Sequence, residues 1–246
     1  MPPSLYTEKE LSILHLLVDQ GLAAIDIGSS YGDYADVLSK LVGHVHCFEP
    51  IPEVRNHAEK RLGERTNITF YPCALSDHEG SEILRIPLFM RQGRLEEISY
   101  IATIEPANQP QCDGQRYENV AVRMLDSFGF RDIGFVKIDV EGHEEAVLKG
   151  SRTLLQGWGP NLLIEIEERH KAGAIETIRQ FLATLDYQGV FYSWYDQKFI
   201  PVEQFQADMH QRSSDLMTSR YSNNFVFSRS EETLARLVRV TPAELG

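Results

Sequence analysis

Short apolar runs alternate along this chain with longer segments in which apolar residues recur at helical spacing. We expect the apolar runs to be buried strands, and they are 22–27, 45–48, 68–73, 135–140 and 162–166. We expect the segments at helical spacing to be amphipathic helices, and they are 34–41, 54–62, 143–155 and 175–185. Strands that alternate with helices in this way predict an α/β fold with a doubly wound, mostly parallel sheet.

The two ends of the chain extend this pattern. Thr7 and Glu10 have the spacing of a capping box, which predicts an N-terminal helix within residues 1–21. Two late apolar runs, 190–195 and 225–227, have no clear helix between them, which favours antiparallel closing strands. The chain therefore predicts a doubly wound, mostly parallel seven-strand sheet with an antiparallel closing strand, in a single domain over residues 1–246.

The pattern is weakest between the third and fourth expected strands. A further strand is expected near 83–86, and then Gly93, Pro106, Pro110 and Gly114 make the chain rich in turn formers. We interpret residues 85–119 as an insertion that covers the pocket of an acceptor molecule.

Composition narrows the class of protein. No apolar run approaches the roughly 18 to 20 residues that span a bilayer, and residues 1–10 lack the pattern of a signal peptide. Three cysteines without paired spacing favour a reducing cytoplasm. The formal net charge of −12 opposes binding to nucleic acid. We expect a cytoplasmic protein that binds neither nucleic acid nor membranes.

Candidate chemistry follows the first two strands. The turn that begins at Gly28 and reaches Gly32 is glycine-rich, and Asp26 precedes it. A dinucleotide fold usually has glycine at the position of Asp26, because a carboxylate beside a pyrophosphate is unfavourable. A cationic ligand such as S-adenosyl-L-methionine suits this turn better, and Glu49, about 20 residues further on, is placed to accept hydrogen bonds from ribose hydroxyls. The alternative for both carboxylates is strand-end capping.

Several motifs together resemble the FkbM family of methyltransferases over about residues 23–227, with the insertion left out. The most specific motif is Lys137-Ile138-Asp139-Val140-Glu141-Gly142-His143-Glu144. The others are the turn 26–32, Phe48-Glu49-Pro50, Ala74-Leu75-Ser76-Asp77, Leu148-Lys149-Gly150 and Leu163-Ile164-Glu165-Ile166. This resemblance implies the class I Rossmann-like methyltransferase fold and methyl transfer to a hydroxyl of a small molecule, sugar or secondary metabolite. It also implies cofactor binding by Asp26, Gly28, Gly32 and Glu49.

The expected site has two parts. The expected cofactor-binding residues are Asp26, Gly28, Ser29, Ser30, Tyr31, Gly32, Glu49, Pro50, Ala74, Leu75 and Asp139. In the segment 73–77, a backbone amide and a short polar side chain are expected to hold the adenine edge. The alternative is that Asp77 only begins a turn before Gly80. Asp139, Glu141 and His143 are the candidate catalytic residues, of which Asp139 or His143 would take the proton of the acceptor hydroxyl. Another interpretation is that His143 only begins a helix. Asp139, Glu141 and Glu165 offer oxygen ligands of the kind that Mg²⁺ prefers, but no spacing demands a metal.

Aromatic residues provide candidates for stacking against an acceptor, although aromatic side chains on strands more often belong to the core. They are Tyr31, Tyr100, Tyr192, Trp194 and Tyr195.

Two other functions stay open. A nicotinamide-dependent oxidoreductase would be favoured if Asp26 pointed away from the ligand. A non-catalytic cofactor-binding module would keep the fold without turnover.

Overall fold

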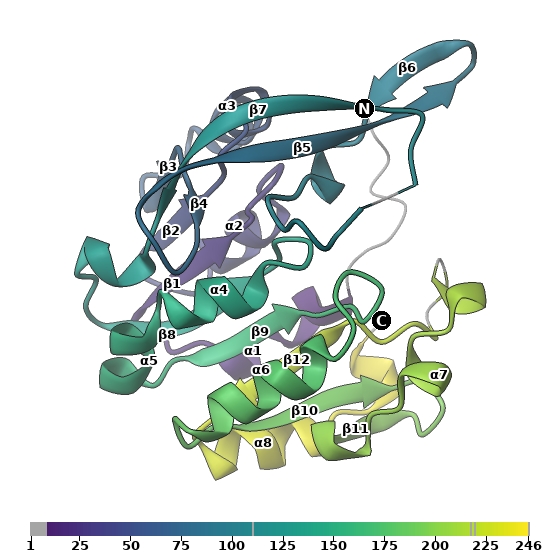
Figure 1. Ribbon diagram of the computed structural model, residues 1–246. Helices are drawn as coiled ribbons and strands as arrows, with labels where there is room; N and C mark the ends of the chain where they lie inside the picture. The colour runs from purple at the N-terminus through teal and green to yellow at the C-terminus, as the bar shows by residue number, and fades with distance from the viewer. Residues whose placement is uncertain (1–8, 110, 217, 219, 246) are drawn as a thin grey trace.

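A computed structural model of the chain describes residues 9–245, except 110, 217 and 219. Its main element is an eight-stranded sheet with the strand order β11-β10-β12-β9-β8-β1-β2-β3 (Figure 1). Five strands are mutually parallel, as expected, and each is short and largely apolar. They are β1 (Ala23–Ile27), β2 (Val45–Phe48), β3 (Ile68–Tyr71), β8 (Ile133–Ile138) and β9 (Asn161–Glu165).

The remaining strands of this sheet are antiparallel to their neighbours. β12 (Asn224–Ser228) lies between β9 and β10 (Gln188–Ser193), and it is antiparallel to both. An eighth strand, β11 (Lys198–Pro201), forms a hairpin with β10. The expected number of seven was therefore one too low, because β11 lies in a segment that we interpreted as a polar connection. The expected antiparallel pairing of the two late strands is confirmed, although β12 lies inside the sheet.

Helices cover both faces of the sheet. Ile25 and Ile27 of β1 belong to a core that also contains apolar side chains of α4, α5 and α6, while Ala24 belongs to the core beneath α1, α2 and α8. The α-helices are α1 (Leu14–Leu17), α2 (Asp33–Leu38), α3 (Pro52–Leu62), α4 (Glu144–Lys149), α5 (Arg152–Trp158), α6 (Ala174–Ala183), α7 (Ala207–His210) and α8 (Glu231–Val238). The 3-10 helices are η1 (Lys9–Ile13), η2 (Ser99–Ile101), η3 (Leu125–Phe128), η4 (Val202–Gln204), η5 (Ser213–Asp215) and η6 (Pro242–Glu244).

Two expected helices differ in the structure. The first begins as the 3-10 helix η1, and Thr7 of the expected capping box lies outside the described residues. The helix expected over 143–155 is divided into α4 and α5 at Gly150, where a Cβ atom would lie 1.9 Å from the Ser76 carbonyl oxygen. The close contact between these two segments explains why residue 150 is a glycine.

The segment interpreted as a loop-rich insertion is largely a second sheet with the order β4-β7-β5-β6. Its strands are β4 (Ala74–Leu75), β5 (Gly80–Arg91), β6 (Arg94–Glu97) and β7 (Gly114–Arg123), so it extends beyond the expected range 85–119. Proline argues against a strand interior, but β6 pairs only with residues 88–91 of β5. Pro87 therefore lies just outside the part of β5 that pairs with β6, at an edge of the sheet. An edge position tolerates the missing N–H of proline. Figure 1 shows this sheet along one border of the molecule, with the β5–β6 hairpin extending outward.

Among the described residues, no helix is both long enough and apolar enough to cross a bilayer.

Candidate functional site

The candidate site lies where three neighbouring parallel strands end. In the order β8-β1-β2, the adjacent carboxyl ends lead into Asp139, the turn at Gly28 and Glu49, respectively. Ligands of open α/β sheets bind outside this edge, near the position where the order of strands reverses. The structure therefore brings the three expected motifs together along one rim of the sheet.

The glycine turn is packed closely against its neighbours. The amides of Gly28 and Ser29 both donate to the Phe48 carbonyl oxygen at 3.0 Å. Gly28 has a φ of +73°, and a Cβ atom there would lie 1.8 Å from the Asp139 carbonyl oxygen. Gly32 has a φ of +86°, and a Cβ atom there would lie 2.8 Å from Leu62 of α3. Gly28 is thus required by the packing of the protein itself and Gly32 by its backbone conformation, whereas we expected both glycines to admit a ligand.

Glu49 connects the end of β2 with the glycine turn. Its carboxylate accepts hydrogen bonds from the Ser30 amide at 3.1 Å and from the Ile51 amide at 2.8 Å. The side chain is buried, and this burial raises its pKa to about 7. A carboxylate has about four acceptor positions, so two remain for a ligand at the same rim.

Asp26 lies beneath the rim and is fully buried. The Lys137 ammonium group lies 4.0 Å from the Asp26 carboxylate and donates to Asp139 at 3.0 Å. It also lies 4.7 Å from the centre of the Tyr34 ring. The sequence analysis expected Asp26 to face a cationic ligand, but Asp139, with a side chain 24% exposed, is the carboxylate that reaches the rim. Any effect of Asp26 on a ligand would act through Lys137 and Asp139.

The substitution Lys137→Met is expected to destabilise the fold by about 3 kcal/mol, because it leaves buried Asp26 without its cation. Urea unfolding would measure this loss. The double variant Asp26→Asn/Lys137→Met should recover much of it, since both charges are then absent. As a control, Lys149→Met removes an exposed ion pair with Glu145 and should cost less than about 1 kcal/mol. Equal losses for the two lysine variants would contradict this account.

We call residues 99–108, which lie between β6 and β7, the second-sheet segment. This segment holds the acidic turn after β8 in place. Glu141 has a φ of +54°, and its carbonyl oxygen accepts from Thr103 Oγ1 at 2.8 Å and from Asn108 Nδ2 at 2.7 Å. Its carboxylate lies 3.2 Å from Nε2 of buried His170. Burial and the nearby Asp139 raise the pKa of Glu141, while burial lowers the pKa of His170 to about 4. The pair is largely screened from water, and only 10% of the Glu141 side chain is exposed.

His143 is engaged on both ring nitrogens. Nε2 lies 2.9 Å from Ser76 Oγ, and Nδ1 lies 3.2 Å from Glu105 Oε2. His143 also occupies the position that precedes α4, so the interpretation that it begins a helix is correct in part. Buried Glu144 accepts from the Gly142 amide at 2.9 Å, and burial raises its pKa to about 7. Asp139 is therefore the expected catalytic residue with the freest carboxylate at the rim.

The other expected residues border this group. Tyr31 reaches the second-sheet segment, where its hydroxyl lies 3.1 Å from Ser99 Oγ. Pro50 and Ala74 are half-buried, whereas Leu75 is a core residue that only its backbone could present to a ligand. Within the described ranges, no three His, Cys, Asp or Glu side chains converge as a metal-binding group.

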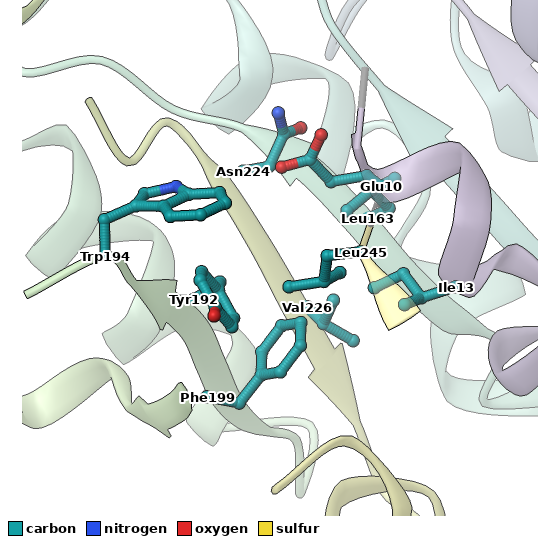
Figure 2. A pocket seen from close by; sticks show the side chains of 9 residues that line it. All are labelled: Glu10, Ile13, Leu163, Tyr192, Trp194, Phe199, Asn224, Val226 and Leu245. Carbon is teal, nitrogen blue, oxygen red and sulfur yellow. The ribbon is translucent and has the colours of Figure 1, made fainter. Parts of the chain in front are cut away.

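Two of the candidate aromatic residues line a different space. Figure 2 shows Tyr192 and Trp194 with Phe199 around a small cavity that Ile13 and Leu245 close from the other side. Its volume of about 10 Å³ holds at most one water molecule. These two rings therefore belong to the packing between β10 and η1.

Several partners of the site residues are brought near only by the fold. Lys137 had a detectable signal, because a lysine inside an otherwise apolar strand requires a buried counter-charge. His170 follows β9 within the polar segment Glu167-Glu168-Arg169-His170, where nothing local points to Glu141. Thr103, Glu105 and Asn108 lie in a segment whose register the sequence did not reveal.

Comparison with known proteins agrees with this architecture. The sequence profile of the methyltransferase FkbM domain matches residues 26–188. The crystal structure of methyltransferase FkbM from Methylobacillus flagellatus KT aligns with a TM-score of 0.56 at 16% identity, over 88% of this chain and 47% of that one. This chain thus spans about half the length of that protein.

A second solved structure is similar over nearly the whole of both chains. The protein SMU.1697c from Streptococcus mutans, in complex with SAH, aligns with a TM-score of 0.50 at 12% identity, over 91% of this chain and 98% of that one. No curated protein is significantly similar in sequence. At these identities the two structures support the fold, and the domain profile supports the family.

Proposed function

Because the chain belongs to the FkbM family of methyltransferases, we propose that it transfers a methyl group from S-adenosyl-L-methionine to a hydroxyl of a small molecule, sugar or secondary metabolite. The observation that carries this proposal is the position of Glu49. Its buried carboxylate lies at the end of β2 and is directed toward the glycine turn by the Ser30 amide. That is the position from which a carboxylate accepts hydrogen bonds from both hydroxyls of a ribose.

Different residues of the rim would bind the two ends of the methyl donor. Glu49 would hold the ribose, the backbone of residues 28–32 would hold the methionine part, and Asp139 would offer its charge to the ammonium group. When bound, S-adenosylmethionine supplies a methyl group on a sulfonium leaving group. The negative side chains at this edge stabilise such a cation, since Lys137 neutralises only one of the charges on Asp26 and Asp139.

Asp139 is also the residue that we assign to the acceptor. Its partly exposed carboxylate would orient the acceptor hydroxyl and take its proton. Glu141 and His143 support this role from buried positions, where each is paired with another side chain. The second-sheet segment 102–108 borders the same turn, which supports our interpretation that the insertion covers the acceptor.

Isothermal titration calorimetry tests the proposal directly. Purified protein should bind S-adenosylmethionine and S-adenosylhomocysteine, and NADH should give no fluorescence enhancement. This second measurement matters because the burial of Asp26 removes one electrostatic argument against a pyrophosphate ligand. Binding of NADH without binding of either methyl donor or product would overturn the assignment. Mass spectrometry with labelled donor and a panel of sugars, phenols and polyketide alcohols would then identify the acceptor.

The affinity for the cofactor product should rise with pH. The pKa of Glu49 is about 7, and the charged carboxylate accepts ribose hydroxyls better than the protonated form. Affinity for S-adenosylhomocysteine at pH 8 should therefore be about tenfold higher than at pH 6, following the charged fraction of one such group. Calorimetry at both pH values measures this ratio, and Glu49→Gln should abolish it. A wild-type ratio near one would remove the titration of Glu49 from binding.

A further inference from the structure

The ring of His143 joins two segments that are distant in sequence. On one side lies Ser76, directly after β4, and on the other lies Glu105, in the segment between η2 and β7. Only 12% of the His143 side chain and 14% of the Glu105 side chain are exposed, and Ser76 is fully buried. The three groups thus form one continuous hydrogen-bonded chain, largely screened from water.

The direction of the two hydrogen bonds follows from the chemistry of the groups. An ionised carboxylate only accepts, so Nδ1–H donates to Glu105 and Nε2 is left as an acceptor. Ser76 Oγ then donates to Nε2 at 2.9 Å, which is shorter than its 3.3 Å contacts with Asp77 and His78. Burial lowers the pKa of His143, so the neutral ring is favoured. Both nitrogens are therefore already committed within the protein.

Each end of this hydrogen-bonded series is connected to a different part of the site. The Ser76 amide donates to the Arg123 carbonyl oxygen at 2.9 Å, within the segment where we expect the adenine edge to lie. The Glu105 amide donates to Thr103 Oγ1 at 2.9 Å, and Thr103 in turn donates to the Glu141 carbonyl oxygen. A displacement of the ring would thus change both the loop at the end of β4 and the acidic turn.

We propose that His143 is a positioning residue that sets the adenine end of the cofactor site through Ser76, under the control of Glu105, and that it is not the proton acceptor. The inference rests on the proposed function, because it assumes that an adenosine group lies beside residues 74–77. It assigns Glu105 a place in cofactor binding although Glu105 belongs to the second-sheet segment. The proton of the acceptor is left to Asp139.

The test measures the affinity of S-adenosylhomocysteine and of 5′-methylthioadenosine, which lacks the amino-acid part. His143→Gln, Ser76→Ala and Glu105→Ala should each weaken both compounds by about tenfold, the value of one buried hydrogen bond. Glu105→Gln should stay close to wild type, because its amide oxygen still accepts from Nδ1. His44→Gln is a matched control that should leave both affinities unchanged. His44, which precedes β2 at the opposite edge of the sheet, makes a similar 2.9 Å contact with Thr69.

A double-mutant cycle separates positioning from general loss of structure. Ser76 and Glu105 bind opposite nitrogens of one ring, so their effects should be non-additive, and neither should matter in the His143→Gln background. Unchanged affinity of both compounds for His143→Gln would overturn the inference, as would full additivity in the cycle. Wild-type protein that binds neither compound would instead overturn the proposed function.

Discussion

Glu49→Ala is expected to weaken binding of S-adenosylhomocysteine by about 1,000-fold, which corresponds to a loss of about 4 kcal/mol. The substitution leaves two ribose hydroxyls without their acceptor in a site where water is largely excluded. It also releases the Ser30 amide, which the Glu49 carboxylate now holds at 3.1 Å. Calorimetry on the wild type and the variant would measure the difference.

Two controls make this result interpretable. Glu53→Ala removes a neighbouring carboxylate on α3 whose side chain is 73% exposed, and its affinity should equal that of the wild type. Thermal unfolding without ligand reports how much stability the lost amide contacts provided. A Glu49→Ala variant that folds and binds with wild-type affinity would exclude Glu49 from the cofactor site.

Gly28→Ala is expected to have the largest effect on stability, a loss of about 5 kcal/mol or more, which is comparable with the whole stability of many domains. The added Cβ would lie 1.8 Å from the Asp139 carbonyl oxygen, so the junction of β1 and β8 must open. The residue also has a φ of +73°, which alanine rarely adopts. Circular dichroism and soluble yield would detect the unfolded variant.

Gly129→Ala is the matched control for this prediction. Gly129 has a similar φ of +62°, but a Cβ atom there meets no other atom within 4 Å. Its substitution should cost only about 1 kcal/mol, the value of the backbone conformation alone. Equal losses for the two variants would mean that the contact with Asp139 adds nothing to the fold.

The parallel half of the fold was predictable because its strands are short apolar runs that end at glycine or acidic residues. The positions of β1, β2 and β8 agree with the sequence within a few residues. Of the second sheet, only the strand expected near 83–86 was predictable, and it lies within β5. β6 carries four exposed residues, so it does not show the pattern of a buried strand. β5 is paired with β7, a contact between distant segments, and β6 is defined by its hairpin with β5.

The candidate site was likewise predictable only in part. Residues that follow strands, such as Glu49 and Asp139, could be placed because parallel strands bring their carboxyl ends to one rim. The burial of Asp26 could not be predicted, since it depends on the register that places Lys137 opposite it on β8. The environment of His143 likewise required knowledge of Ser76 and Glu105, which come from either end of the second sheet.

The position of β12 in the sheet affects how the chain folds during synthesis. β9 and β10 are never neighbours, because residues 224–228 separate them. A ribosome that has made everything up to residue 223 has therefore produced two apolar strands without the partner that joins them. The C-terminal third of the sheet must assemble late, and until then its open edges are available to other nascent chains or to a chaperone.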